Sequence, residues 1–244
     1  MVQDRKNRTT DDMKPAVAWI MALWAALAAP AQADTAPVVV ELYTSQGCSS
    51  CPPADALLAE LGERDGVIAL ALHVDYWDYI GWKDVFGSPQ FTERQRAYAR
   101  AAGARTIYTP QMIVDGMEHL VGARPAELTA LIKRYEAMPE QAVLDVARKG
   151  GTLAISARTI GRLPRGAVVQ LVRYKPEETV EIRSGENAGR EISYRNIVTE
   201  WHSLGTWDGS APLSMAVPVS NSQPIVVILQ EPGPGRIIAA RALK

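Results

Sequence analysis

Strand-like and helical runs alternate along the first half of the chain, and this alternation limits the fold more than any other feature of the sequence. VVVELYTS (38–45) and VIALALHVDYW (67–77) are continuous apolar runs typical of buried strands. PQMIVDG and EHLVGA predict a hairpin that turns at Asp115-Gly116. Apolar residues at helical spacing occupy the segments 52–63, 88–103 and 124–137. The resulting order, β-α-β-α-β-β-α, predicts a mixed α/β sheet.

Helical spacing stops after Pro139, and only strand-like runs follow. Between residues 141 and 244 these runs are short and are separated by Gly, Pro and Asn, as in a small antiparallel sandwich. The candidate strands are AVLDVARKG, TLAISARTI, AVVQLVRYK, TVEIRSG, REISYRNIVTEW, APLSMAVPV, PIVVILQE and GRIIAARAL. The sequence therefore predicts an α/β domain over 34–139, followed by a mostly antiparallel β module over 140–244.

The N-terminal segment has the pattern of an export signal. Lys14 precedes an apolar run at 16–29 and an A-Q-A motif at 31–33, which predicts a cleaved signal peptide over 1–33. If the chain started at Met13, Lys14 alone would form the basic region before the apolar run, and the signal would follow the usual pattern more closely. The apolar run is shorter than the roughly 20 residues of a membrane span, and an uncleaved anchor is the alternative. We expect a periplasmic or secreted protein without a stable membrane span, in a compartment where paired cysteines normally form disulfides.

The charge and the motif content of the chain exclude several classes of function. With 26 Lys and Arg against 27 Asp and Glu, the formal charge is −1 at pH 7, so there is no basic excess to bind nucleic acid. The sequence has no recognisable glycine-rich phosphate loop and no paired-carboxylate pattern of a hydrolase, and it implies no organic cofactor. The two cysteines are then the most informative residues.

Three functions compete for these cysteines, which stand in QGCSSCPPAD (46–55). A structural disulfide across so short a loop contributes only about 2 kcal/mol, against about 4.7 kcal/mol for a loop of about 100 residues. A closed zinc site needs four ligands, but thiolates suit Cu(I), and Cys48, Cys51 and His73 could bind copper. A redox dithiol is favoured, because Cys-x-x-Cys stands at a strand-to-helix junction within an α/β pattern.

The prolines at positions 52 and 53 mark the start of the helix beside the second cysteine. Proline is tolerated in a helix only in the first turn. We therefore expect unpaired N–H groups and the positive end of the helix dipole to point at the sulfurs. This field would stabilise a thiolate, the nucleophile of disulfide exchange. Ser49 and Ser50 are expected to cap the helix or to donate to sulfur.

The position of each cysteine suggests its role. Cys48 is predicted to be the exposed, attacking thiol, and Cys51 the thiol that resolves the mixed disulfide. Glu41 lies in the preceding apolar strand, where it is either buried or at a surface strand end. A buried Glu41 would have a raised pKa and could relay a proton to Cys51.

These residues resemble the thioredoxin superfamily over about residues 37–137. The resemblance rests on the strand before the dithiol, on Cys48-Ser49-Ser50-Cys51 and on Tyr108-Thr109-Pro110. It implies that Pro110 is a cis-proline that opens the third strand beside the dithiol. Thr109, next to Tyr108, would then offer backbone groups to a bound chain. Glu41 resembles the buried acid that thioredoxins carry on the strand before their cysteines.

The chain is similar, more closely, to a secreted bacterial family, domain-of-unknown-function family 1223. The similar stretches are VELYTSQGCSSCPPAD (40–55), HVDYWDYIGWKD (73–84), YTPQMIVDG (108–116) and GENAGREISYRNIV (185–198). This resemblance implies a thioredoxin-like fold and no established activity. The chain departs from thioredoxins in three ways. Gly47 replaces an aromatic residue, Ser-Ser replaces a proline between the cysteines, and Pro52 disfavours the helical conformation at Cys51.

Two further segments are candidates for the site. In HVDYWDYIGWKDVF (73–86), Asp75 and Trp77 are expected to line the site, and Trp82 to pack within its own loop. SGENAGREISYRN (184–196) is a predicted hairpin that either folds over the dithiol or docks a partner, or is an ordinary exposed turn.

The sequence thus predicts an exported thiol–disulfide oxidoreductase that acts on a protein or small-molecule thiol or disulfide. A copper-handling protein and a non-catalytic binding module are the alternatives.

Overall fold

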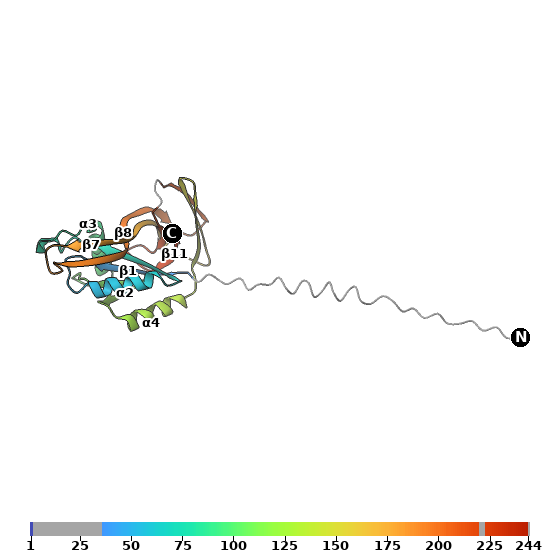
Figure 1. Ribbon diagram of the computed structural model, residues 1–244. Coiled ribbons are helices and arrows are strands. Elements are labelled where there is room, and N and C mark those ends of the chain that lie inside the picture. Colours follow the sequence, from blue (N-terminus) through green and yellow to red (C-terminus); the bar gives the residue numbers. More distant parts are fainter. Residues whose placement is uncertain (2–35, 220–222, 244) are drawn as a thin grey trace. The chain divides into compact units, whose positions relative to one another are not determined.

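The structure is a computed structural model that describes residue 1, residues 36–219 and residues 223–243 (Figure 1). The predicted signal peptide, residues 1–33, lies outside these described residues apart from Met1. None of the helices in the described ranges is long and apolar enough to cross a membrane.

The first part of the chain has the predicted order of elements. In chain order they are β1 (Val38–Thr44), α2 (Pro52–Gly62), β2 (Val67–His73), the 3-10 helix η1 (Asp78–Ile80), α3 (Pro89–Ala101), β3 (Gln111–Val114), β4 (Glu118–Val121) and α4 (Pro125–Glu136). Their limits follow from local chemistry. Ser88 caps α3 by accepting a hydrogen bond from the N–H of Gln90. The β3–β4 turn places Asp115 and Gly116 at positive φ, as predicted for an Asp-Gly hairpin.

The second part of the chain contains strands only. They are β5 (Ala142–Lys149), β6 (Thr152–Thr159), β7 (Ala167–Ile182), β8 (Arg190–Trp207), β9 (Leu213–Pro218), β10 (Ile225–Gln230) and β11 (Ile237–Leu243). The sequence predicts two separate strands where the structure has β7. Pro176 interrupts the apolar pattern there, but pairing with β8 resumes at once, since Lys175 pairs with Ile197 and Glu177 with Arg195.

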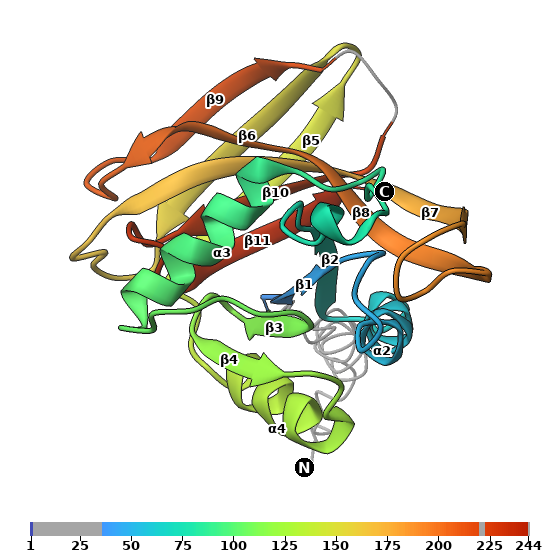
Figure 2. The same ribbon diagram turned by 90° about the vertical axis from the view of Figure 1, so that its left-hand side faces the viewer.

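Strands from both parts of the chain join one eight-stranded sheet, in the order β11-β10-β7-β8-β2-β1-β3-β4. The pairs β1–β2 and β2–β8 are parallel, and the others are antiparallel. The fold is therefore mixed α/β with a large, mostly antiparallel sheet, as Figure 2 shows. The predicted division into 34–139 and 140–244 stays a prediction.

A smaller sheet, in the order β5-β6-β9, forms a second layer against the large one (Figure 2). The apolar core between the layers takes side chains from both sheets, among them Leu144 and Ile155 from the small sheet and Val169, Val227 and Ile238 from the large sheet. This layer is the sandwich-like part of the predicted β module.

Helices cover both faces of the large sheet near β1. Even-numbered residues of β1, such as Val40 and Leu42, pack with Leu58 of α2 and Leu128 of α4. Odd-numbered residues of β1 face the other side, where Tyr43 packs near Tyr98 of α3. Because α2 is fixed on the first face, its N-terminus lies at the carboxyl end of β1, where ligands bind in open α/β sheets.

Glu41 is at the centre of a buried polar cluster on the α3 face. Its carboxylate is fully buried and accepts two hydrogen bonds of 2.7 Å from Arg94. The hydroxyls of Tyr98 and Tyr43 donate to it as well, at 2.6 Å and 3.0 Å. Burial opposes the charge on Arg94, but the Glu41 carboxylate, together with Tyr98 and Tyr43, outweighs that effect and raises the pKa of the guanidinium. The alternative that Glu41 is a surface residue is therefore wrong.

These contacts give Glu41 a structural role. Its side chain points to the face of the sheet opposite α2, and Arg94 also stacks at 3.7 Å over the Trp201 ring of β8. The cluster thus ties β1, α3 and β8 together. The predicted proton relay from Glu41 to Cys51 has no support in these contacts.

Arg94→Ala is expected to destabilise the protein by about 3–5 kcal/mol, because it leaves the Glu41 carboxylate buried without its cation. Urea unfolding at pH 7 measures this change. Arg96→Ala is the matched control, since Arg96 lies on the same helix but pairs with Glu93 in solvent. It should cost less than about 0.5 kcal/mol. Equal effects of the two substitutions would show that the buried pair does not hold the layers together.

Candidate functional site

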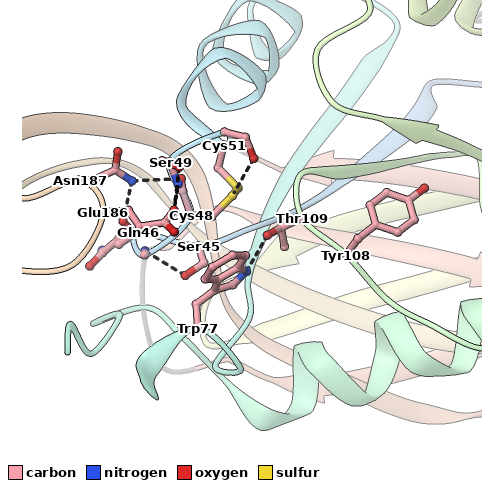
Figure 3. Close-up of a disulfide and its surroundings, with 12 residues drawn as sticks. Ser45, Gln46, Cys48, Ser49, Cys51, Trp77, Tyr108, Thr109, Glu186 and Asn187 are labelled. Atoms are coloured by element: carbon pink, nitrogen blue, oxygen red, sulfur yellow. Dashed lines mark hydrogen bonds between the residues drawn. A yellow bond between two sulfur atoms is a disulfide. The ribbon is translucent and has the colours of Figure 1, made fainter. Parts of the chain in front are cut away.

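Cys48 and Cys51 form a disulfide in the loop between β1 and α2, with their Cα atoms 5.4 Å apart (Figure 3). The loop turns tightly, because the N–H of Cys48 donates to the carbonyl of Ser45 and the N–H of Cys51 donates to the carbonyl of Cys48. The two sulfurs are therefore presented at the carboxyl end of β1, directly before the helix.

The start of α2 differs from the prediction. Pro52 and Pro53 have no N–H group, and the N–H groups of Ala54 and Asp55 donate to the carbonyl of Cys51 at 2.8 Å and 3.1 Å. The expectation that unpaired N–H groups point at the sulfurs is therefore wrong. Cys51 immediately precedes the helix and has helical backbone angles, although a proline follows it.

The two serines between the cysteines do not cap the helix, because α2 has no side-chain cap. The hydroxyl of Ser50 instead lies 3.4 Å from the sulfur of Cys48. This is the second of the two roles expected for these serines. It leaves the helix dipole and one hydroxyl as the groups that can stabilise a thiolate at position 48.

The disulfide is covered. Cys48 is 1% exposed and Cys51 is 0% exposed, so the expectation of an exposed Cys48 is wrong. One cover is the loop that contains η1. A Cβ added to Gly47 would lie 3.1 Å from the side chains of both Trp77 and Ile80. This close approach explains why glycine stands before the first cysteine, where the thioredoxin resemblance implies an aromatic residue.

The tip of the β7–β8 hairpin is hydrogen-bonded to the loop that carries the disulfide. The amide Nδ2 of Asn187 donates to the carbonyls of Gln46 and Cys48, at 2.9 Å and 3.0 Å. Glu186 accepts from the backbone N–H and the hydroxyl of Ser49, at 3.1 Å and 2.7 Å. These bonds hold the pKa of Glu186 below its usual value. Of the alternatives for this segment, the structure therefore supports the one in which it folds over the dithiol (Figure 3).

Of the residues predicted to bind substrate, Trp77 and Thr109 are bonded to each other beside the dithiol loop, whereas Tyr108 and Asp75 have other surroundings. The indole of Trp77 lies against the dithiol loop and donates to the hydroxyl of Thr109 at 2.7 Å (Figure 3). The peptide bond between Thr109 and Pro110 is cis, as the thioredoxin resemblance implies. The ring of Tyr108 points away from the disulfide in Figure 3. Asp75 accepts from the hydroxyl of Thr92 at 2.6 Å, which ties it to α3.

The other aromatic residues of this loop have separate environments. Trp82, expected to pack within its own loop, donates to the side chain of Gln46 at 2.8 Å. Tyr79 is 82% exposed and stacks on Trp77, with ring centroids 6.4 Å apart. Trp77 and Tyr79 therefore form an aromatic surface beside the dithiol loop.

A cluster of buried polar side chains lies under α2, at the carboxyl ends of β1 and β2. His73 is bonded to Asp84 at 2.8 Å. Burial raises the pKa of Asp55 to about 6, although nearby His73 acts in the opposite direction. A hydrogen bond from the hydroxyl of Thr44 also acts to lower the pKa of Asp55. Among the described residues, Gln46 Nε2 and His73 Nε2 of this region are buried without a hydrogen bond to another protein group. Buried polar atoms without a protein partner are rare and costly.

The copper alternative depends on His73. The ring of His73 is held by Asp84 and by edge contacts with Phe86 and Tyr194. In the part of the chain that the structure describes, no group of three or more His, Cys, Asp or Glu side chains could hold a metal ion.

The sequence does not single out Asp55, and it indicates Glu186 and Asn187 only as members of the candidate segment 184–196. A local signal for Asp55 does exist, because it follows Cys51 by four residues, and such a pair shares one face of a helix. Glu186 and Asn187 are separated from the dithiol loop by more than a hundred residues, so no local pattern connects them.

Comparison with known proteins supports one family. A family model described as "Protein of unknown function (DUF1223)" matches residues 39–230. A crystal structure of a structural genomics target from Agrobacterium tumefaciens is similar to the chain, with 33% sequence identity and a TM-score of 0.72. That match covers 84% of this chain and 93% of the other. No curated protein matches the chain.

The raised pKa of Asp55 predicts a pH-dependent stability. The carboxyl titrates near 3.8 when unfolded and near 6 when folded, so between these values the folded protein keeps a proton that the unfolded chain releases. The contribution of Asp55 to stability should fall by about 3 kcal/mol as pH rises through this window. Asp55→Asn should remove this contribution and leave the one from Asp115, whose pKa burial raises to about 7, as measured by urea unfolding from pH 4 to pH 7.5.

Glu60→Gln is the control for this measurement, because Glu60 is exposed on the same helix. It should keep the wild-type dependence on pH. Parallel pH profiles for Asp55→Asn and wild type would contradict the raised pKa.

Proposed function

We propose that this chain, which belongs to the DUF1223 family of proteins of unknown function, is a thiol–disulfide oxidoreductase that uses Cys48 and Cys51. The observation that carries the proposal is the disulfide itself, which joins residues three apart at the junction of a strand and a helix. So small a loop contributes little loop entropy, about 2 kcal/mol, so stabilisation alone is a weak reason for the bond.

A thioredoxin-like arrangement of residues 38–136 belongs to this proposal. Its support is the order of elements and the strand order β2-β1-β3-β4 on one side of the large sheet. The dithiol precedes the first helix of this unit, and Thr109 and Pro110 precede β3. Trp77 and Thr109 are the residues that we assign to binding the partner chain.

In the exchange that we propose, the electrons pass only between the dithiol and its partner. A partner thiolate attacks the sulfur of Cys48, a mixed disulfide forms, and the Cys48–Cys51 bond breaks. Cys51 leaves as a thiolate and takes up a proton. A second partner thiol then attacks the mixed disulfide and displaces Cys48. The partner is oxidised to a disulfide, and two electrons and two protons reach the cysteine pair. The reverse sequence reduces a partner disulfide.

Asp55 is the residue that we assign to proton transfer at Cys51. It lies one helical turn further along α2, is buried, and has a pKa of about 6. A pKa near the working pH lets one carboxyl both accept and return a proton. Asp55 therefore takes the role that the sequence assigned to Glu41, which lies on the other face of the sheet.

The partner in this proposal is a protein or small-molecule thiol or disulfide outside the cytoplasm. The export signal predicted at residues 1–33 supports that location, because such compartments sustain disulfides. The conversion needs no organic cofactor, since the electrons pass between sulfur atoms.

Cys51→Ser is expected to accumulate mixed disulfides between Cys48 and its partners, because the resolving thiol is absent. The variant is expressed with its signal in the native compartment, thiols are trapped with acid, and adducts are separated without reductant and identified by mass spectrometry. Cys48→Ser, which retains Cys51, is the matched control and should yield few adducts. Absence of adducts on Cys51→Ser, at equal protein level, would count against the proposed function.

Ser50→Ala is expected to raise the pKa of the Cys48 thiol in the reduced protein by about one unit, since a hydroxyl that donates to a thiolate stabilises it. The rate of iodoacetamide alkylation against pH, in a Cys51→Ser background, gives this pKa. Ser49→Ala should leave the midpoint unchanged, because the contacts of Ser49 are to Glu186. Equal midpoints for Ser50→Ala and its parent would contradict the assigned role of Ser50.

A further inference from the structure

We propose that the tip of the β7–β8 hairpin, residues 184–189, is a latch over the Cys48–Cys51 disulfide, and that thiol exchange requires this latch to open. This inference rests on the proposed function, because a latch regulates the site only if the disulfide exchanges. It concerns access to the dithiol rather than the chemistry of the exchange.

The latch makes polar contacts with three residues of the dithiol loop: Gln46, Cys48 and Ser49. Asn187, which is 2% exposed, uses its one amide nitrogen to bond the carbonyls of both Gln46 and Cys48. Glu186 binds Ser49, which lies between the two cysteines. Arg190 donates to the side-chain oxygen of Asn187 at 2.9 Å and so fixes the orientation of its amide. The tip therefore recognises the backbone of the loop that carries the disulfide.

The closed latch is incompatible with exchange. An incoming sulfur must reach one sulfur of the disulfide along the line of the bond that breaks, so that sulfur needs an open approach. With the tip and the η1 loop in place, both cysteines are almost completely buried. The same loop whose carbonyls bond Asn187 would have to accommodate the partner chain.

The tip can leave without loss of the hairpin. Pairing between β7 and β8 ends at Ile182 and Arg190, and Ile182 is fully buried, so the ladder below the tip stays anchored. Beyond it, Gly185 and Gly189 have φ values of 79° and 80°, a conformation that glycine adopts easily. Glycines therefore flank the segment that would move. Opening breaks the hydrogen bonds to the dithiol loop and the one from Ser184 to the carbonyl of Gly81, all of which water can replace, and it separates Gly185 from Ile80 and Trp82.

The latch also favours some partners over others. A small thiol has no surface with which to displace the tip, whereas a protein can displace it by binding the neighbouring aromatic pair, Trp77 and Tyr79. The closed latch thus protects the disulfide from small thiols and reserves it for a protein partner.

The test is the rate of reduction of the oxidised protein by excess dithiothreitol at pH 7.5, followed by acid quench and mass spectrometry. Asn187→Ala combined with Glu186→Ala should increase this rate at least about tenfold. Glu186→Ala alone should give a smaller increase, and it preserves the test if the double variant folds poorly, because Glu186 is at the surface. Glu181→Ala is the control. Glu181 is exposed on β7, and its replacement removes the same negative charge as Glu186→Ala, so the rate should stay unchanged.

A second readout separates opening of the latch from general loosening of the fold. Hydrogen exchange in the variants should increase at 184–189 and at the dithiol loop, and should stay unchanged in β10, which is fully buried. An increase in exchange throughout the sheet would attribute faster reduction to global destabilisation, and would overturn the latch.

The remaining outcomes distinguish the latch from the proposed function. If wild type and variants are reduced at the same measurable rate, the latch is overturned and the oxidoreductase stands. If all of them stay oxidised when native and are reduced only in denaturant, the proposed function fails, and the latch fails with it.

Discussion

The parallel pairing of β2 with β8, registered at Ala71 and Ile197, determines where the functional parts of the molecule meet. It attaches the long β7–β8 hairpin to the α/β layer, so that the hairpin runs beside α2 and its tip reaches the dithiol loop. Helix α2 and strand β8 pack closely, since a Cβ on Gly62 at the end of α2 would lie 2.5 Å from the side chain of Asn196 in β8. A slip of one residue would turn the buried face of β8 outward, which is why such a register is strongly specified.

The disulfide combines features of a reactive site with features of a protected one. A helix start and a serine hydroxyl favour a thiolate at position 48, and Asp55 is a buried acid with a pKa close to neutrality. Both cysteines are nevertheless almost completely buried, and the hairpin tip is bonded to the loop that carries them. A disulfide whose surroundings favour a thiolate, but which is buried, is consistent with exchange that begins only when a partner binds. A non-catalytic binding module would need neither the buried acid nor the serine contact.

Local patterns in the sequence were sufficient for the order of elements, the Asp-Gly hairpin, the family and the pairing of the cysteines. They failed where the deciding contact joins distant segments. Glu41 is held by Arg94, 53 residues away, and Ser49 is hydrogen-bonded to Glu186, 137 residues away, so neither environment could be read from neighbouring residues. The expectation about helix N–H groups failed for a local reason, because the prolines that mark the helix start also remove two of those groups.

The reduction potential of the Cys48–Cys51 disulfide tests the central claim most directly. It is obtained by equilibrating the native protein with glutathione and dithiothreitol redox buffers of known potential and counting alkylated cysteines by mass spectrometry. The account predicts a value between about −120 and −270 mV, the range of dithiols that exchange with partners. A value below about −300 mV, typical of structural disulfides, would contradict it.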